Sequence, residues 1–460
     1  MLSRLGEKVS ALFQATAPDP FVLAVLLTAA TLLLVIGLTD HTPAEAVGFW
    51  SHPSKGVWAF LGFSMQMCMI LVTGHALAAS PPARRVLGLV SGLPRTAAQG
   101  AALVAFVAAA LGVLNWGLGL VGGALLARDV GRSLARRGVR AHYPLLAACG
   151  YVGLLVWHGG FSGTAPLKVT TAAQIADVLP PEIAPDPIPI TQTVLSPMNL
   201  VATGGLLLLV PLFMSLLTPK NADAIEPISA FCPEDPEPAA RVADVSKPAL
   251  PRLLEDTPIV TVVLVLLLGA WAVPYYAPGG GAPSGVRTLT PNTVNLTMLM
   301  LGLILHGTPA RYVRAVDDAA RGCAGIMLQF PLYAGIMGMM HQSGLTAQLA
   351  GALSERATDT TLPIYTFLSA GVVNLFIPSG GGQWGVQGPI AVQAALDAGV
   401  PLPKIVMAVA YGDQLTNMLQ PFWALPLLAI TGVRARDIVG YTAVLMLVAG
   451  LWLAGCLLVF

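Results

Sequence analysis

Charged residues are scarce in this 460-residue chain. Asp, Glu, Lys and Arg make up only 10% of it, whereas hydrophobic residues make up 55%. Soluble domains carry roughly 25% charged residues, so the composition predicts a polytopic membrane protein rather than a soluble domain with an anchor. The formal net charge is only +1, which lacks the basic excess expected of a nucleic-acid-binding protein.

Clustered cysteines are also missing. The five cysteines are scattered and no CxxC pair occurs, so we predict neither a disulfide nor a metal site. The N-terminal segment has a short amphipathic pattern but no apolar core of about 7–15 residues with a cleavage site, so we predict no signal peptide. The cysteines are Cys68, Cys149, Cys232, Cys323 and Cys456.

Long apolar runs dominate instead. A helix needs about 20 mostly apolar residues to cross a membrane. The sequence predicts clear crossings at 20–39, 57–80, 197–217, 258–276 and 438–459, and weaker or interrupted ones at 143–177, 293–307, 324–345 and 403–428. Two further runs, 97–127 and 361–395, are broken near their middles by glycine-rich or polar residues, so we interpret them as re-entrant hairpins.

The distribution of basic residues predicts the orientation. With the N-terminus in the cytoplasm and neither hairpin crossing, the cytoplasmic segments are 1–19, 81–97, 128–142, 218–257, 308–323 and 429–437. These segments hold 19 of the 24 Lys and Arg residues, which is the bias that cytoplasmic loops show. This bias predicts a cytoplasmic N-terminus and, after nine crossings, a C-terminus on the opposite side, which is the periplasm in the expected location, a bacterial inner membrane. The proline-rich acidic segment 218–257 is expected to be a flexible linker.

The segments on either side of the linker follow the same order. In residues 1–217 a crossing leads to the hairpin of 97–127, then to the interrupted crossing of 143–177 and a last helix. Residues 258–460 repeat this order with the hairpin of 361–395 and the interrupted crossing of 403–428. In the predicted orientation the two halves run in opposite directions. Inverted repeats with a broken helix in each half are typical of secondary transporters, which bind substrate near the bilayer midplane. The predicted fold is therefore all-α and polytopic, with an inverted repeat, two re-entrant hairpins and two interrupted transmembrane helices.

The tip of the second hairpin, "PSGGGQ" at 378–383, is an unusual sequence for membrane depth. Non-helical backbone survives there only when it is buried in protein or lines a wet cavity. Glycine permits close backbone approach, and a half-helix that starts at the tip directs its positive dipole end at the cavity, which suits a carboxylate. Unwound carbonyl groups and Asn or Gln side chains suit a small cation.

Four motifs carry a resemblance to a known family: "VNLFIPSGGGQWGVQGP", "GDQLTNMLQPFWALP", "HGGFSGTAPL" and "LNWGLGLVGGALLAR". They resemble the short-chain fatty acid transporter family, a branch of a wider ion-transporter superfamily, and the resemblance covers roughly residues 10–460. It implies an uptake carrier for acids such as butyrate or acetoacetate, without a cofactor. It also implies a homodimer with a scaffold and a mobile transport domain, an elevator movement, and symport with H⁺ or Na⁺.

One departure from the superfamily leaves the coupling ion open. Relatives hold Na⁺ and the substrate carboxylate with Ser-Asn-Thr motifs at the hairpin tips. This sequence has Asn115 without a serine, Asn374 with Ser379 five residues later, and Thr416-Asn417 in reverse order. A Na⁺ ion would accordingly lie near Asn115, Asn374 and Asn417.

Asp413 and His158 are the main titratable candidates. Asp413 is the only carboxylate well inside a predicted span, and an intramembrane acid is by default a functional candidate. We assign it to coupling, together with Thr416; the alternative is a structural carboxylate paired with a helix N-terminus or with Lys168. His158 opens the first break and either binds the substrate anion and relays a proton or bonds to unwound backbone.

The remaining candidates are polar and aromatic residues at the breaks. Asn115, Asn374 and Asn417 lie at matched points of the repeat and are expected to line the substrate site, unless they only satisfy broken backbone. Trp116 and Trp384 either form the wall of an acyl pocket or are plain packing residues. The other predicted substrate-binding residues are Ser162, Thr164, Ser379, Gly380, Gly381, Gly382 and Gln383, with Gln387 in support.

Other functions fit less well. A C4-dicarboxylate or other small-anion carrier is the alternative within the carrier class, but few fixed cations lie at membrane depth, which favours a monocarboxylate.

"GFSG" at 160–163 matches the GxSG of intramembrane serine proteases, with Ser162 as nucleophile and His306 or His341 as its partner. Such proteases have no reason to show an inverted repeat, so we predict no enzyme activity. A channel would show flux without saturation or counter-ion dependence.

Overall fold

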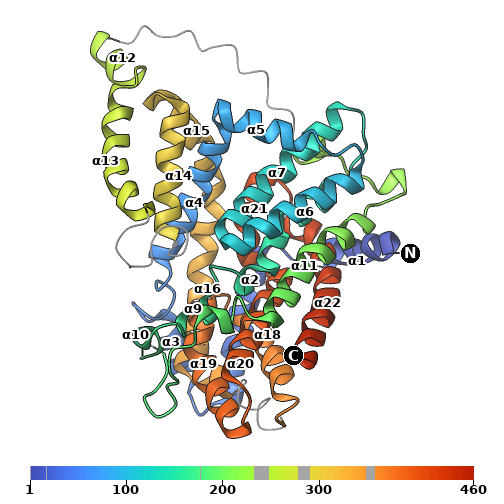
Figure 1. Ribbon diagram of the computed structural model, residues 1–460, viewed down its shortest axis with the longest axis vertical. Helices are drawn as coiled ribbons and strands as arrows, with labels where there is room; N and C mark the ends of the chain where they lie inside the picture. The colour runs from blue at the N-terminus through green and yellow to red at the C-terminus, as the bar shows by residue number, and fades with distance from the viewer. Residues whose placement is uncertain (1, 17, 177, 233–247, 278–290, 349–357) are drawn as a thin grey trace.

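The computed structural model describes the whole chain except residues 1, 17, 177, 233–247, 278–290 and 349–357 (Figure 1). Its described residues form helices and no strands. Seven of their helices are long and apolar enough to cross a membrane, or eight if the bent pair α4–α5 counts as one span. The all-α polytopic fold class predicted from the composition is confirmed.

Seven of the nine predicted crossings each coincide with a single helix. The clear ones are α2 (Pro20–Leu38), α4 (Leu61–Ala79), α11 (Pro197–Leu216), α13 (Ile259–Tyr276) and α22 (Ala435–Val459), and the weaker ones include α14 (Pro291–His306) and α16 (Ala324–Gln342). Local signals set the helix starts. Pro20 occupies the first turn of α2, and the Asp19 side chain accepts a hydrogen bond from the Phe21 N–H, which satisfies a donor that the helix leaves open.

Both predicted hairpins are helix–break–helix units. The first consists of α6 (Ala97–Leu114) and α7 (Trp116–Arg136), separated by Asn115 alone. The second consists of α18 (Leu362–Phe376) and α19 (Gly380–Ala398), separated by residues 377–379. By length and composition α6 could also cross the membrane, so the re-entrant path of the hairpins stays a prediction.

Both interrupted crossings contain short 3₁₀ segments. The first runs through α8 (Tyr143–Tyr151), η1 (Val152–Leu155), η2 (Trp157–Gly159) and α9 (Thr164–Lys168). The second runs through α20 (Leu402–Thr416), η8 (Asn417–Leu419) and α21 (Pro421–Thr431). The shorter elements are α3 (Pro43–Ser51), α5 (Pro81–Ser91), α10 (Ala172–Ala176), η3 (Ile190–Gln192), η4 (Ala222–Ala224), η5 (Ile228–Ala230), α12 (Ala249–Glu255), α15 (Pro309–Ala320) and η7 (Arg321–Cys323).

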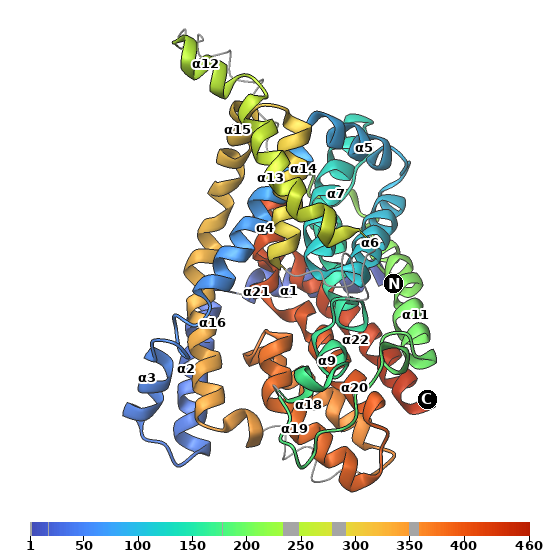
Figure 2. The same ribbon diagram turned by 60° about the vertical axis from the view of Figure 1, so that its left-hand side comes forward.

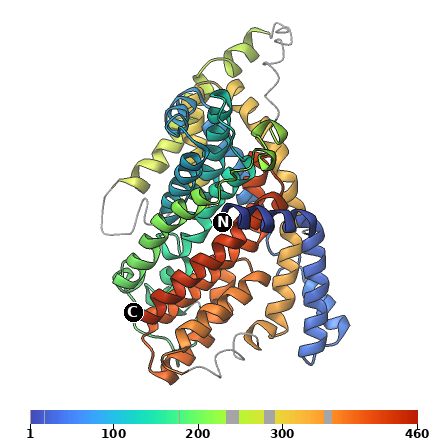
Figure 3. The same ribbon diagram turned by 90° about the vertical axis from the view of Figure 1, so that its right-hand side faces the viewer.

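The helices pack as two bundles, which Figure 2 shows side by side. The first bundle contains α2, α3, α4 and α13 to α16, and the second contains α6 to α11 and α18 to α22. They meet mainly where α4, α16 and η7 contact α7, α18 and α21. Helix α1 (Leu2–Thr16) packs against α22 of the second bundle (Figure 3).

Each half of the chain packs against the other in a reciprocal way. In the first bundle α2 and α3 lie on α16, while α14 and α15 lie on α4. In the second bundle α7 lies on α21, while α19 lies on α9. Such pairs are expected of an internal repeat in which helices of each half pack on helices of the other half. Whether the two halves are inverted depends on how the chain crosses the membrane, so the inverted relation stays a prediction. The middle of the predicted linker, residues 233–247, lies outside the described residues, and its described ends contain η4, η5 and α12.

Candidate functional site

A small cavity lies where the two breaks and the second hairpin tip meet. Its volume is about 230 Å³, below the roughly 300–1,000 Å³ of pockets for drug-sized ligands. The cavity therefore suits a ligand with few heavy atoms, and we call it the tip cavity. Its lining residues are Phe63, Leu154, Trp116, Trp157, Trp423, Thr164, Ser379, Gly380 and Gly381.

The start of α19 forms a polar side of the tip cavity. The Ser379 hydroxyl accepts a hydrogen bond from the Gly382 N–H at 3.2 Å, and the Ser379 carbonyl accepts one from the Gln383 N–H. Gly380 and Gly381 lie in the first turn of this 19-residue helix, where the amide N–H groups have no acceptor within the helix. Such a helix start stabilises an anion.

The tip glycines provide close approach rather than a left-handed turn, since none of them has a positive φ. A Cβ added at Gly380 would lie 2.8 Å from the Trp157 ring and 3.0 Å from Cε1 of His158. A Cβ added at Gly381 would meet only Thr164 Cγ2, at 3.7 Å. Gly380 is therefore required for packing, whereas a side chain at Gly381 has room to extend.

Aromatic rings form much of the rest of the wall. The ring centroids of Trp116 and Trp423 lie 5.2 Å apart, and those of Phe63 and Trp423 lie 5.9 Å apart, both with edge-to-face geometry. The cavity thus combines backbone donors at α19 with apolar surfaces contributed by α4, α7 and α21. This combination suits a ligand with one anionic end and a short apolar chain.

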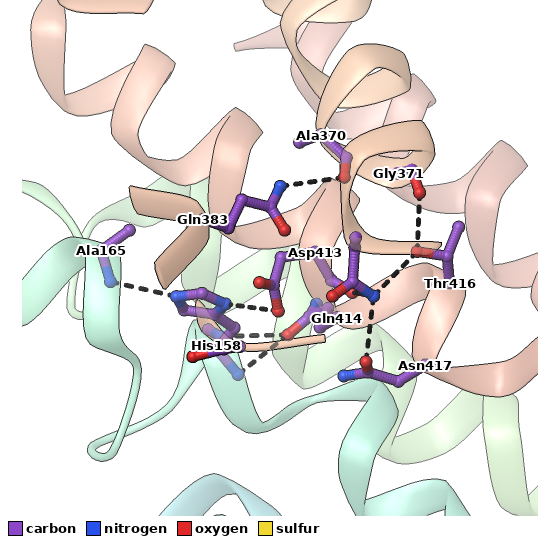
Figure 4. A network of polar contacts seen from close by, with 12 residues as sticks. His158, Ala165, Ala370, Gly371, Gln383, Asp413, Gln414, Thr416 and Asn417 are labelled. Carbon is purple, nitrogen blue, oxygen red and sulfur yellow. Dashed lines mark hydrogen bonds and ion pairs between the residues drawn. The ribbon is translucent and has the colours of Figure 1, made fainter. Parts of the chain in front are cut away.

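His158 and Asp413 form a buried pair next to the cavity (Figure 4). His158 Nδ1 lies 3.0 Å from Asp413 Oδ1, and both residues are 1% exposed. His158 Nε2 accepts the Ala165 N–H at 3.0 Å, so the hydrogen-bond pattern assigns the imidazole proton to Nδ1, which donates to the carboxylate. Asp413 thus pairs with neither of the two partners, Lys168 or a helix N-terminus, that the sequence suggested.

The two breaks satisfy each other's backbone. Gln414 Oε1, on the second broken crossing, accepts hydrogen bonds from the N–H groups of His158 and Gly159 at 3.1 Å. Conversely, the Tyr151 hydroxyl lies 3.0 Å from the carbonyl oxygens of both Asn417 and Gln420. Buried polar groups need such partners, so each half supplies what the other half's break leaves open.

A buried polar layer lies behind the cavity. Asn374 Nδ2 lies 2.8 Å from the Asp413 carbonyl oxygen, 3.0 Å from Thr416 Oγ1 and 3.0 Å from Asn417 Oδ1. Thr416 also donates to the Gly371 carbonyl oxygen at 2.9 Å. Asn374 Oδ1 and Asp413 Oδ2 are buried and have no hydrogen-bond partner. The structure therefore brings these predicted residues together, but not onto the cavity wall.

Other predicted residues secure local structure. Asn115 Oδ1 accepts hydrogen bonds from the Gly117 and Leu118 N–H groups, and Ser162 Oγ accepts one from the Trp116 N–H at 3.0 Å. Both side chains thus complete the start of α7 and do not line the cavity.

Three residues predicted around the second tip also lie off the cavity. Gln383 Nε2 donates to the Ala370 carbonyl oxygen and to Gln387 Oε1, both at 2.9 Å, which ties α19 to α18. Gly382 faces Met337, and Trp384 is buried against Gly388. Of the predicted binding residues, Thr164, Ser379, Gly380 and Gly381 line the cavity, as does Trp116.

The sequence did not single out four lining residues: Phe63, Leu154, Trp157 and Trp423. Trp157 precedes the first break and Trp423 follows the second, so an aromatic residue beside a break was an available signal. Phe63 lies in an ordinary apolar stretch of α4, and only the packing of the two bundles brings it to the cavity. Gln414 was also missed, although it directly follows Asp413 in the motif.

The protease alternative finds no supporting geometry. Ser162 Oγ bonds to the Trp116 N–H, and His306 Nε2 lies 2.7 Å from the Ala76 carbonyl oxygen, where it joins α14 to α4. No serine–histidine pair involving Ser162 occurs among the described residues. The same part of the chain contains no group of three His, Cys, Asp or Glu side chains that could hold a metal ion, and its five cysteines are free.

Comparison with known proteins gives a consistent result. The sequence model of a family described as "Short chain fatty acid transporter" matches residues 1–460. A protein of Escherichia coli (strain K12) is 40% identical over 98% of both chains, and one of Haemophilus influenzae (strain ATCC 51907 / DSM 11121 / KW20 / Rd) is 38% identical over 96% of both. Both are named "Putative short-chain fatty acid transporter". The crystal structure of the Alcanivorax borkumensis YdaH transporter matches 96% of this chain and 97% of its own at 18% identity, with a TM-score of 0.44.

Proposed function

Because this integral membrane protein belongs to the short-chain fatty acid transporter family, a family of transporters and not enzymes, we propose that it is a secondary active transporter of short-chain monocarboxylates such as butyrate or acetoacetate. The observation that carries this proposal is the tip cavity. It joins the open start of α19 to a wall of aromatic rings within about 230 Å³.

In the proposed complex the carboxylate accepts hydrogen bonds from the Gly380 and Gly381 N–H groups and from the Thr164 hydroxyl. The acyl chain lies among the rings of Trp116, Trp157 and Trp423 and beside Phe63. None of the lining residues is Lys, Arg or His. A second carboxylate, as in a C4-dicarboxylate, would therefore lose water without gaining a cation, which favours a monocarboxylate.

The coupling charge is proposed to reside at the His158–Asp413 pair. His158 lies against Gly380, since a Cβ at that glycine would come 3.0 Å from Cε1 of the ring. A proton taken up by the pair would offset the charge of a bound carboxylate in a low-dielectric site. Na⁺ is the second candidate, because Asp413 Oδ2 and Asn374 Oδ1 are buried oxygens without hydrogen-bond partners, and oxygen ligands suit a hard cation.

The packing supports an elevator movement as part of the proposal. Eight of the nine lining residues belong to the second bundle, and only Phe63 belongs to the first. A shift of the second bundle along α4 and α16 would therefore carry the cavity nearly intact across the membrane, with the first bundle fixed in a homodimer. The expected setting is the bacterial inner membrane, with the N-terminus cytoplasmic and the C-terminus periplasmic.

A matched pair of variants on α19 tests the cavity. Gly381→Val should place its side chain in the cavity, because only Thr164 lies within 4 Å of the new Cβ. Gly385→Val changes a glycine of the same helix that faces open space and serves as the control. In proteoliposomes with labelled butyrate, Gly381→Val should lose at least about tenfold in apparent affinity, because the added side chain keeps the carboxylate away from at least one backbone donor, and a hydrogen bond to a charged group contributes about 1.5–3 kcal/mol. Wild-type butyrate transport by a well-folded Gly381→Val variant would refute the site.

A further inference from the structure

A second cavity lies between α4 of the first bundle and α21 of the second bundle. The same two helices contribute Phe63 and Trp423 to the tip cavity. The volume of the second cavity is about 270 Å³. Leu71 and His75 of α4 form one side, Arg321 and Gly322 of η7 form another, and Ala429 of α21 belongs to the third. We call it the Arg321 cavity.

The two cavities are successive along α4 and α21. The tip cavity uses Phe63 of α4 and Trp423 of α21, and the Arg321 cavity uses Leu71 and Ala429, which lie further along the same helices. At 1.5 Å per helical residue the offset is about 9–12 Å. It points toward the end of the molecule where α5, α12 and α15 lie (Figure 1).

Charge distinguishes the two cavities. The tip cavity has no basic lining residue, whereas the Arg321 cavity has Arg321 and His75. Arg321 makes no ion pair among the described residues, and an arginine stays charged at any physiological pH. The exposed Asp317, one helical turn earlier, is likewise not paired with it. An exposed guanidinium that lines a cavity and has no carboxylate partner within the described part of the chain suits a small anion.

The Arg321 cavity belongs to both bundles, because η7 and α4 of the first bundle face α21 of the second there. The contact is close: a Cβ added at Gly322 would lie 2.8 Å from the Ala429 Cβ and 3.1 Å from Leu71. Any shift of the second bundle must therefore pass this point. An anion bound at Arg321 would be held by the fixed bundle beside the path of the moving one.

We propose that the Arg321 cavity is a second binding station for the transported carboxylate. The carboxylate binds there on its path between the solvent and the tip cavity. In the proposed orientation the Arg321 cavity lies on the cytoplasmic side. Arg321 provides the charge, and Leu71 and Ile430 cover the short acyl chain. The inference rests on the proposed function, since both cavities take the same class of ligand. The phosphate of an anionic lipid headgroup shares this chemistry and is the competing occupant.

The test measures the local potential and the occupancy of the cavity directly. Ala429→Cys places a thiol on the exposed cavity wall, and its reaction rates with an anionic and a cationic methanethiosulfonate reagent are compared in detergent. The five native cysteines, four of them buried, give the background rate in the parent protein. The positive charge of Arg321 raises the reaction rate of the anionic reagent and lowers that of the cationic one. Arg321→Gln should therefore lower the anionic-to-cationic rate ratio about 3- to 10-fold, whereas Arg314→Gln, an exposed arginine on α15, should leave it unchanged.

Butyrate protection then tests the ligand. Butyrate should slow the reaction of Cys at position 429 with saturation, and it should still do so when Gly381→Val blocks the tip cavity. A rate ratio unaffected by Arg321→Gln would overturn the proposal, as would protection that disappears with Gly381→Val. Protection by phosphatidylglycerol vesicles, with none by butyrate, would assign the cavity to a lipid headgroup and overturn it as well. Butyrate uptake by the Ala429→Cys protein reports the proposed function separately, so the two failures are distinguishable.

Discussion

At the scale of single residues, the His158–Asp413 pair shows how the second half of the chain completes the first. Each residue is 1% exposed, and an unpaired charge at that depth is costly. The sequence indicated each residue separately as a functional candidate. It could not show that they pair, because 255 positions separate them and only the packing of α20 against η2 brings them together.

Asp413→Asn should separate coupling from binding. The amide keeps the shape and the hydrogen-bonding capacity of the side chain but cannot take up a proton or balance a cation. We expect gradient-driven accumulation of butyrate to fall to passive equilibration, while butyrate exchange continues. The control is Asp397→Asn, an exposed acid that pairs with Gln393. Uphill uptake in Asp413→Asn at the wild-type level would exclude Asp413 as the coupling group.

Asn374→Ala should act on stability more than on substrate contact. Asn374 does not line the tip cavity, but its side-chain Nδ2 lies close to three acceptor oxygens, those of the Asp413 carbonyl, Thr416 Oγ1 and Asn417 Oδ1. Its loss leaves buried acceptors unsatisfied, which costs about 1–3 kcal/mol. The thermal midpoint of the purified protein should fall accordingly. An unchanged midpoint combined with lost butyrate binding would instead place Asn374 at the ligand.

At the scale of elements, the sequence predicted where the helices of both helix–break–helix units and of both interrupted crossings break, while the re-entrant path of the hairpins stays a prediction. Glycine, proline and polar residues cannot continue a helix in an apolar run without exposing backbone, so the breaks are visible without a structure. The cavity wall was less predictable. Phe63 and Leu154 resemble any other apolar residue of a span, and their place at the site depends on how α4 and η1 pack.

Asn115 provides an element-scale prediction. Its side chain accepts the Gly117 and Leu118 N–H groups at the start of α7, so Asn115→Ala should destabilise the protein by about 1 kcal/mol. Asn115→Asp keeps the cap and should retain both stability and the cation dependence of transport. A shift in Na⁺ dependence with Asn115→Asp would show instead that Asn115 lies at a cation site, as the repeat had suggested.

At the scale of the whole molecule, the inverted repeat stays a prediction that depends on the orientation of the chain in the membrane. A cysteine placed at Ala230, before the undescribed part of the linker, should be protected from an impermeant thiol reagent in right-side-out vesicles. One placed at Pro185, on the opposite side, should be labelled. The reverse pattern would overturn both the orientation and the inversion.

The central claim is that the chain transports a short-chain monocarboxylate and couples this to a cation gradient. The most direct measurement is the initial rate of labelled butyrate uptake by proteoliposomes of the wild-type protein, under separately imposed H⁺ and Na⁺ gradients. Unlabelled acids from acetate to hexanoate and a C4-dicarboxylate serve as competitors. We predict saturable accumulation above equilibrium under one of the two gradients, inhibited by the monocarboxylates and not by the dicarboxylate. Uptake that reaches only equilibrium under both gradients, or that the dicarboxylate inhibits as strongly as butyrate does, would contradict the claim.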